Sequence, residues 1–508
     1  QNYGLTKITD KKVVLEHTNA NPNKALHLGH LRNACLGSAI EKILEGVGAD
    51  VEVQYYVDDT GVQVAHTALG MKELSLEQKE NEKFDQFAAR VYVETVQKME
   101  LSEDLKQKQA QIIEALDKHD GEIAAYVKDL AGKILLENLS TMRRFDIDYD
   151  LLVWESDIIG FGFWQKAFEV LRQSSEFIKS EEGKNNGCYV IKNVLGDDKV
   201  IVKSNGVVTY TGKDIAYHFW KFNLLGQDFK YKKCQNYPQE KDLYTTSLEG
   251  EDSEKFGRAD EVVNIIDVRQ SFPQEAVKAS LKALGYGQQS DQLHHIAYGV
   301  VNLSKKTAES LGVNVADNKN SYAMSGRQGI GIMADDLLDK TIAALEQKHP
   351  DSFNKEKIAA GAIKYNLLNY NPYSEIVFDL DSSLDINGNS GPYIQYAHAR
   401  CSSILEKTAG REVEIDDSYA LNEQELSLAK EIQYFPQIVK AAAETYAPNL
   451  ICNYLFDLAK KFNAFYAVCP ILNSSEEEFA VRLLLTRATR QVLKNGLSLL
   501  GIDAPDKM

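Results

Sequence analysis

Long apolar runs, cysteine pairs and an excess of positive charge are all missing from this 508-residue sequence. No apolar run approaches the ~20 residues that a membrane-spanning helix needs, which argues against a membrane protein. The six cysteines form no Cys-x-x-Cys pair, so the sequence predicts reduced, buried thiols in a cytoplasmic enzyme and neither a zinc site nor a disulfide framework. The net charge of −17 excludes a general polyanion binder, although one basic face could still hold a nucleic acid.

The composition that remains is typical of an ordinary globular protein, with 44% hydrophobic and 26% charged residues. A chain of this length is too long for one compact core and predicts about three packed units. It begins at Gln1 and reaches an apolar strand almost at once. We therefore expect that an upstream portion has been removed or left out.

The first 60 residues have the pattern of a strand, a loop, a helix and a second strand. Residues 13–15 are apolar, residues 18–24 form an asparagine-rich loop, and residues 28–46 keep helical spacing. Gly48 is a stop signal, and residues 51–57 alternate like a second strand. This pattern predicts the βαβ opening of a parallel nucleotide-binding sheet.

Further along the chain, helical and strand signals alternate in blocks. Residues 68–145 are charged and helical, short strands return over 189–210, residues 262–268 have the pattern of a buried strand, and residues 273–284 that of a helix. Beyond 335 nearly everything is helical, with helices expected near 353–369, 391–407, 423–446, 448–466 and 476–500.

These signals predict an α/β fold, namely a Rossmann-type, doubly wound parallel sheet with a helical insertion, followed by an all-α C-terminal bundle. The expected domains are a nucleotide-binding domain over 1–290 with insertions at about 66–260, a connecting region over 291–390, and a helical domain over 391–508.

A first chemical signature, His27-Leu28-Gly29-His30, lies where the first strand gives way to the first helix. Free N–H groups and the helix dipole favour phosphate there, and two imidazoles can bind phosphate oxygens. Lys24 adds a positive charge that can reach a triphosphate. The alternatives are two incidental histidines at a helix N-terminus and an ordinary surface lysine.

Three segments around this signature resemble arginyl-tRNA synthetases, a class I family. They are residues 16–33, which include the histidine signature, residues 55–63, and Thr209-Tyr210-Thr211-Gly212-Lys213-Asp214. The resemblance extends from about residue 10 to residue 508. It implies that the chain activates L-arginine with ATP and transfers it to tRNA(Arg), with Mg²⁺ and without zinc, as a cytoplasmic monomer.

An arginine substrate requires carboxylates that match the planar fork of its guanidinium. Tyr210 and Asp214 are four residues apart and would share one helical face. The resemblance assigns Glu16, Tyr210 and Asp214 to the guanidinium. It assigns the amino and carboxylate ends of arginine to Asn19, Asn21 and Gln270. The alternatives are a core tyrosine at 210 and a helix N-terminal carboxylate at 214.

The second signature of class I synthetases, Lys-Met-Ser-Lys, is altered in this chain. Met324 and Ser325 are present, Ala323 and Gly326 replace the two lysines, and Arg327 follows. The resemblance implies ATP binding by His27, Gly29, His30, Met324 and Ser325, and catalysis by Lys24, His27, His30 and Arg327. We expect a working enzyme, because Lys24, Arg327 and Mg²⁺ can together neutralise the pyrophosphate.

Two other functions remain open at this stage. A catalytically impaired, tRNA-binding relative would explain the altered second signature. A small-molecule adenylyltransferase would share the histidines but would not need the C-terminal helices.

The C-terminal helices carry a row of basic residues. Arg487, Arg490 and Lys494 lie three and four residues apart on one side of a helix, with Arg482 nearby. A solvated helix face is the alternative. Residues 391–400, 453–459 and 504–508 resemble the family's anticodon-binding domain, which implies tRNA contacts by Arg400, Arg487, Arg490 and Lys494. The family usually has a further N-terminal domain that binds the outer corner of tRNA, and we expect that domain to be missing from this sequence.

Overall fold

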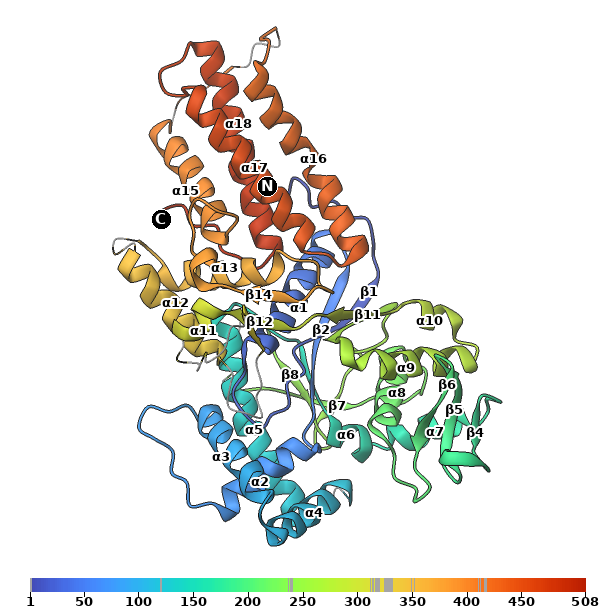
Figure 1. Ribbon diagram of the computed structural model, residues 1–508. Helices are drawn as coiled ribbons and strands as arrows, with labels where there is room; N and C mark the ends of the chain where they lie inside the picture. The colour runs from blue at the N-terminus through green and yellow to red at the C-terminus, as the bar shows by residue number, and fades with distance from the viewer. Residues whose placement is uncertain are drawn as a thin grey trace.

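A mixed β-sheet runs through the middle of the molecule in the computed structural model (Figure 1). Within the described residues its strands follow the order β11-β10-β1-β2-β3-β8-β7-β9. Neighbours from β11 to β8 are parallel, whereas β7 pairs antiparallel with β8 and β9. The strands are β1 (Lys12–Glu16), β2 (Asp50–Val57), β3 (Leu151–Trp154), β7 (Lys230–Lys233), β8 (Tyr244–Thr246), β9 (Glu251–Asp252), β10 (Glu261–Asp267) and β11 (Leu293–Tyr298).

The structure describes most of the chain. The described residues are 2–118, 121–235, 237, 241–310, 312, 315, 320–323, 332–348, 350, 352–409, 411, 413–414 and 418–508.

Apolar residues on both faces of β1 explain why the sheet is covered on both sides. Val13 and Leu15 belong to one core, which includes helix α1 (Leu28–Gly46). Val14 points to a second core, which includes helices α8 (Tyr210–Lys221) and α9 (Ser271–Ala283). The predicted doubly wound sheet and the predicted span of the first helix are therefore confirmed. Gly48, with φ of +97°, follows the end of α1 and turns the chain into β2.

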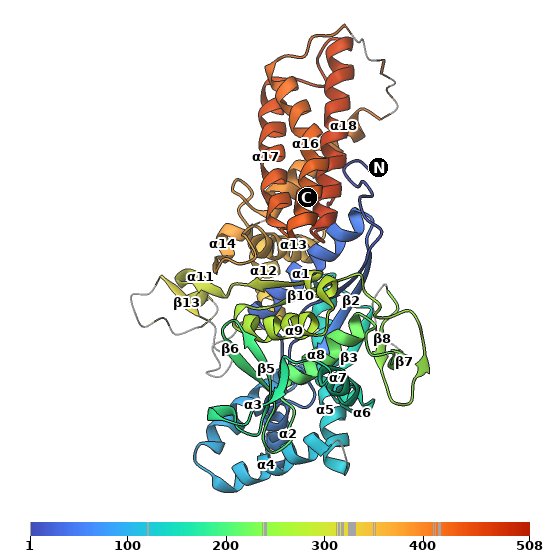
Figure 2. The ribbon, with the colours of Figure 1, turned by 90° about the vertical axis from the view of Figure 1, so that its right-hand side faces the viewer.

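The predicted helical insertion lies between β2 and β3. Its helices are α2 (Val62–Glu73), α3 (Phe84–Met99), α4 (Glu103–Lys118) and α5 (Gly121–Arg144). Figures 1 and 2 show these helices at one end of the molecule, with the sheet between them and the C-terminal helices.

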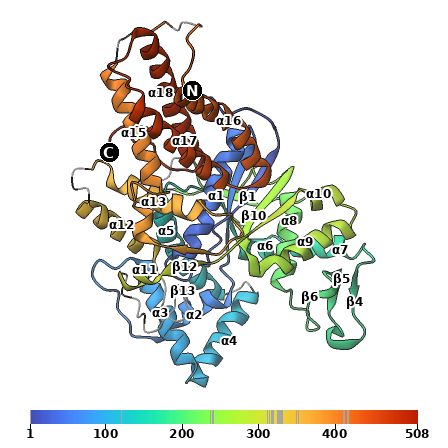
Figure 3. The same ribbon diagram turned by 45° about the horizontal axis from the view of Figure 1, so that its top comes forward.

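A second excursion separates β3 from β10. It contains α6 (Glu155–Gly160), α7 (Phe163–Leu171), a 3₁₀ turn at Gly183–Asn185, and a small antiparallel sheet of β4 (Phe177–Lys179), β5 (Tyr189–Val194) and β6 (Asp197–Val202), before it reaches α8. The predicted run of strands over 189–210 ends early, because the chain turns at Gly206 (φ +84°) and Tyr210 already opens α8. Figure 3 shows the small sheet at the edge of the molecule, away from the C-terminal helices.

A linking region joins the main sheet to the C-terminal helices. After β10 come a 3₁₀ turn (Val268–Gln270), α9, α10 (Gly287–Asp291) and β11. The link itself consists of β12 (Val301–Ser304), α11 (Lys305–Ser310), β13 (Ser321–Ala323), α12 (Ala334–Lys348), α13 (Lys355–Leu368), β14 (Ile376–Phe378) and α14 (Leu380–Ser383). Strands β13, β12 and β14 form a separate sheet.

The chain ends in four long helices that stand on the sheet domain (Figure 2). They are α15 (Gly391–Lys407), α16 (Glu423–Thr445), α17 (Asn449–Val468) and α18 (Glu476–Leu499), close to the predicted spans. Ser390, Asn422 and Ser475 cap the first turns of α15, α16 and α18, which explains where these helices begin. Among the described helices, none is both long enough and apolar enough to cross a membrane.

Candidate active site

A cavity of about 590 Å³ opens where the strands of the main sheet end at their carboxyl edge. Parallel sheets bind ligands at this edge. The loop after β1 and the start of α1 form one wall, and the ends of β10 and β11 form the other. Of the residues that the sequence predicts for the site, Asn19, Asn21, Lys24, His27, Gly29 and His30 line it.

The two histidines of the signature are locked together at the start of α1. His27 is the N-cap residue, and its Nδ1 accepts hydrogen bonds from the backbone N–H groups of Gly29 (3.1 Å) and His30 (3.4 Å). His30 Nδ1 accepts the N–H of His27 at 3.4 Å, and the two rings stack at 3.7 Å. Because each Nδ1 accepts a hydrogen bond, each neutral ring carries its own proton on Nε2. Both rings therefore present an Nε2–H donor.

Burial and the charge of Lys24 keep these imidazoles neutral. Burial, followed by Lys24, lowers the pKa of His27 to about 4. The pKa of His30 is also lowered, by burial, by His27 and by Lys24. Lys24 lies over the ring of Tyr92, with Nζ 5.1 Å from the centroid. At neutral pH the turn thus combines two uncharged donors with one cation, which suits a phosphate group.

Glu16 ends β1, as predicted, but its charge is already balanced inside the protein. The side chain is buried and forms an ion pair with Lys221, which is itself completely buried. Asn19 Nδ2 donates to the other carboxylate oxygen at 2.5 Å, while Asn19 Oδ1 accepts the N–H of Tyr56 at 2.8 Å. Glu16 therefore fixes the orientation of the Asn19 amide at the cavity wall.

Tyr210 and Asp214 lie on the first turns of α8, one turn apart. Tyr210 is 53% exposed, which rules out the alternative of a core tyrosine, and Lys199 Nζ lies 5.3 Å from its ring centroid. Burial, together with the charges of Glu16 and Glu155, raises the pKa of Asp214 to about 8. Within the part of the chain that the structure describes, no side chain or backbone donor is hydrogen-bonded to the Asp214 carboxylate. Glu16 and Asp214 are thus brought close enough to interact electrostatically.

Sequence reasoning missed a further carboxylate, Glu155, at the first position of α6. It accepts hydrogen bonds from Tyr56 Oη (2.7 Å), Lys213 Nζ (2.5 Å) and the Thr60 hydroxyl. The available signal was the apolar run at 151–154, which forms β3 next to β2 and places the following residue at the ligand-binding edge.

The acidic groups around this point outnumber the cations. Burial, followed by Glu155 and Asp59, raises the pKa of Asp58 to about 7. Among the described residues, four carboxylates, those of Glu16, Asp58, Glu155 and Asp214, thus interact with two ammonium groups, those of Lys213 and Lys221. Two of the four acids remain uncompensated, and they hold protons near neutral pH. A bound organic cation would displace those protons.

Some residues that the sequence predicts for the site are not among those that line the cavity. Gln270 is exposed at the end of its 3₁₀ turn, and the cavity is lined instead by Asp267 and Arg269, which pair with each other at 2.7 Å. Met324, Ser325 and Arg327 lie outside the described residues.

A buried arginine, Arg32, joins α1 to the opposite wall of the cavity. Its guanidinium donates to the carbonyl oxygens of Gly299 (2.6 Å), Ser374 (2.8 Å) and Pro372 (3.1 Å). Burial lowers its pKa to about 10. The neighbouring residues Tyr298, Val300 and Val301 line the cavity. Arg32 therefore fixes the distance between the histidine turn and the far wall.

On the C-terminal helices, the residues predicted to bind RNA differ in exposure. Arg487 and Lys494 are exposed, whereas Arg490 is partly buried and donates to Ser402 Oγ and Asp506 at 2.6 Å each. Arg400 lies between the rings of Tyr396 and Tyr466, at 4.7 and 5.4 Å from their centroids. Both tyrosines are about 40% exposed.

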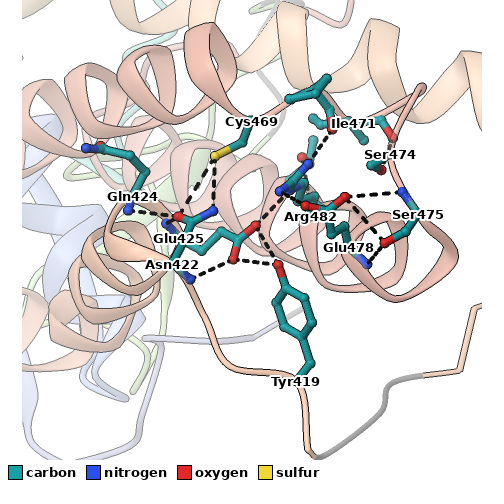
Figure 4. Close-up of polar contacts among 12 residues, drawn as sticks. Tyr419, Asn422, Gln424, Glu425, Cys469, Ile471, Ser474, Ser475, Glu478 and Arg482 are labelled. Carbon is teal, nitrogen blue, oxygen red and sulfur yellow. Dashed lines mark hydrogen bonds and ion pairs between the residues drawn. The ribbon is translucent and has the colours of Figure 1, made fainter.

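Arg482, which the sequence places near this basic row, does not share its exposed face. Figure 4 shows its side chain turned inward, where it donates to Glu425 (2.7 Å) and Glu478 (2.5 Å). Glu425 also accepts from the Tyr419 hydroxyl and the Asn422 backbone N–H. Arg482 precedes Arg487 by five residues, which is about 140° around an α-helix, and it points toward α16, against which α18 packs. Arg482 therefore joins helices and is not available to RNA.

Arg482→Met should lower the free energy of unfolding by about 3 kcal/mol, because it leaves the buried Glu425 without its charge partner. Denaturant unfolding is the measurement. Arg487→Met, on the same helix but exposed, should change stability by less than about 0.5 kcal/mol. Equal midpoints for the two variants would show that the buried pair contributes nothing.

Comparisons with known proteins match both halves of this architecture. The class I tRNA synthetase (R) catalytic-domain family matches residues 1–228, and the DALR anticodon-binding-domain family matches residues 394–508. The arginine–tRNA ligase of Thermococcus sibiricus is 37% identical and covers 100% of this chain and 82% of its own length. That of one Thermus thermophilus strain is 38% identical, covering 98% and 82%. The solved Thermus thermophilus arginyl-tRNA synthetase has a TM-score of 0.86 at 34% identity, covering 100% of this chain and 85% of that one.

Proposed function

Because this chain belongs to the arginyl-tRNA synthetases, we propose that it joins L-arginine to tRNA(Arg) at the expense of ATP, using the cavity beside the His27–His30 turn. The observation that carries the proposal is the excess of carboxylates around Asp214, which interacts with Glu16 at the end of β1, the strand that leads into the His27–His30 turn. An amino acid with a guanidinium side chain and a nucleotide would each find a matching surface there.

In the first step, the arginine carboxylate attacks the α-phosphate of ATP, a P–O bond to the amino acid forms, and pyrophosphate leaves. The Nε2–H groups of His27 and His30 would donate to phosphate oxygens, whose charge develops in the transition state. Lys24 would neutralise the leaving pyrophosphate, and we retain Arg327 in the same role. Met324 and Ser325 remain proposed ATP contacts.

For the guanidinium, we propose Asp214 as the carboxylate, with Tyr210 packing against the planar group. Glu155 is already engaged by Tyr56, Lys213 and Thr60 and supports the acidic group without direct contact. Glu16 then acts on the guanidinium only through its negative charge and without a direct hydrogen bond, because Lys221 and Asn19 already engage its two oxygens. The Asn19 and Asn21 amides line the cavity and would hold the amino and carboxylate ends of arginine. We also propose Gln270 as a contact of the bound arginine. In the protein without substrate, Arg269 and Asp267 line the cavity in its place.

In the second step, a hydroxyl of the terminal ribose of tRNA attacks the activated carbonyl carbon, and AMP leaves. We propose Arg487, Lys494 and Arg490 as phosphate contacts along α18. Arg400, which lies over the rings of Tyr396 and Tyr466, would stack with an unpaired base of the tRNA.

Mg²⁺ is proposed to enter bound to the triphosphate, where it supplies charge for the departing pyrophosphate. The donor set of the cavity fits this route. Histidine and lysine side chains line the cavity and would contact the phosphates, whereas the nearby Asp267 carboxylate is engaged by Arg269. A monomeric, cytoplasmic enzyme without zinc remains our proposal, and its six free cysteines are consistent with it.

ATP–pyrophosphate exchange, measured with arginine and tRNA(Arg) each present or absent, tests the function. Exchange and aminoacylation that require arginine are expected. Arginine-independent exchange would favour an adenylyltransferase for another small molecule. Binding of tRNA without any exchange would identify a catalytically impaired relative, the interpretation that the altered second signature favours.

A further inference from the structure

A buried carboxylate, Asp335, connects the phosphate-binding turn to the helical insertion. It lies in the first turn of α12, immediately after a short stretch that pairs with the turn. Leu28 N–H donates to Ile332 O at 3.1 Å, and Ala334 N–H donates to Leu26 O at 2.8 Å. The segment that leaves the second-signature region is therefore bonded directly to the backbone on either side of His27.

Three donors from the insertion satisfy the Asp335 carboxylate. Arg144 donates to one oxygen at 2.9 Å, and Lys83 Nζ (2.9 Å) and Thr141 Oγ1 (2.7 Å) donate to the other. Asp335 is 7% exposed. Burial opposes its charge, yet the bonds from Lys83, Thr141 and Arg144 prevail, and the pKa of Asp335 is lowered. The ionised carboxylate thus joins α5 and the start of α3 to α12.

The same group of insertion residues also holds the other side of the turn. Ala25 N–H donates to the backbone oxygen of Asp85 at 3.0 Å. Asn138, with its amide nitrogen facing the two acceptors, reaches Asp85 Oδ2 at 3.2 Å and the Lys24 carbonyl at 3.3 Å. Lys83, which binds Asp335, lies 3.8 Å from the Asp85 carboxylate. The backbone of Lys24 and the start of α12 are therefore anchored to one polar cluster.

We propose that Asp335 is a positioning residue for nucleotide activation, which locks the helical insertion to both backbone segments that place Lys24 and His27. The inference rests on the proposed function of that turn. We call the bonds of Asp335 to Arg144, Lys83 and Thr141 the clamp. None of them involves Asp214 or Glu155, so the clamp acts on the phosphate-binding part of the site and not on the guanidinium-binding part.

Asp335→Asn tests the clamp, because it keeps the shape of the side chain and removes its charge. We expect kcat for arginine-dependent exchange to fall on the order of 10- to 100-fold and the KM for ATP to rise, since small misplacements at a reacting centre cost that much. The affinity for arginine alone should change by less than about twofold. Asp335 shares no contact with the proposed guanidinium site, and changes at sites without shared partners usually have independent effects. The matched control is Asp339→Asn, which removes an exposed partner of the same Arg144 (2.6 Å) and should leave the kinetics unchanged.

Two further measurements separate positioning from mere stability. Thr141→Val removes one of the three donors to Asp335. It should also lower kcat and raise the KM for ATP, by smaller factors than Asp335→Asn, and leave arginine affinity unchanged. In a Lys24→Ala background, Asp335→Asn should cost little further activity if it acts through Lys24. A purely additive loss, an equal loss of arginine affinity, or an equal effect of Asp339→Asn would each overturn the proposal. ATP binding by calorimetry reports on the clamp even if arginine fails as the substrate, so that the two failures remain distinguishable.

Discussion

Asp214→Asn should lower kcat/KM for arginine by about a thousandfold, because truncating one partner of a buried charge pair costs about 4 kcal/mol. In the protein without substrate, this carboxylate has no hydrogen-bond donor among the described residues. A guanidinium would supply that donor in a planar, two-pronged form. The KM for ATP should remain nearly unchanged, since the histidine turn is made by α1 and not by α8.

The same residue predicts how arginine recognition depends on pH. The pKa of Asp214 is raised to about 8 in the free protein, and a bound guanidinium favours the ionised form. Arginine affinity should therefore be greatest above pH 8 and should fall by up to about tenfold for each pH unit below it. Lowering the pH protonates the acid that the substrate needs. Asp214→Asn should remove the part of this dependence centred near pH 8 and leave only the part that Asp58, with its pKa raised to about 7, contributes.

Citrulline has the shape of arginine without its charge. Comparing the two amino acids as substrates therefore tests whether Asp214 recognises the positive charge of arginine. The wild-type protein should reject citrulline strongly, because a neutral side chain leaves the acidic group uncompensated. Asp214→Asn should narrow the ratio between the two amino acids by losing arginine activity. An unchanged ratio, or a variant as active as wild type on arginine, would remove Asp214 from the recognition site.

Local signals account for the parts of the fold and site that the sequence predicts well. Periodicity and backbone preference within a few residues determine strand β1, helix α1 and the end of that helix near Gly48. The structure has all three at the expected positions. Tyr210 and Asp214 follow the same rule, since a spacing of four on a helix places both on one side.

Contacts between distant segments account for what sequence reasoning missed. Glu155 reaches the site only because β3 pairs with β2 after an insertion of four helices, so no pattern near residue 155 reveals its neighbours. The partner of Glu16, Lys221, is 205 residues away. Arg482 lies near a basic surface row in the sequence, and only its contacts with α16 show that it is buried. Periodicity predicts which residues share a face, but not what that face contacts.

His27→Asn should lower the rate of adenylate formation about 100- to 1000-fold, as expected for the loss of one donor to developing charge. The asparagine oxygen can replace Nδ1 as the acceptor for the N–H groups of Gly29 and His30, so helix α1 keeps its cap. The Nε2–H donor is lost, however, because the shorter side chain ends before that position. His27→Gln places an amide nitrogen near Nε2 and should recover much of the rate. Since the pKa of His27 is lowered to about 4, the histidine stays neutral above pH 5, and the chemical step should show no titration near pH 6.5. Pyrophosphate exchange under saturating substrates, with the melting temperature of each variant as the control, makes the comparison. If the two variants were equally slow, the Nε2–H group would not be what binds the phosphate.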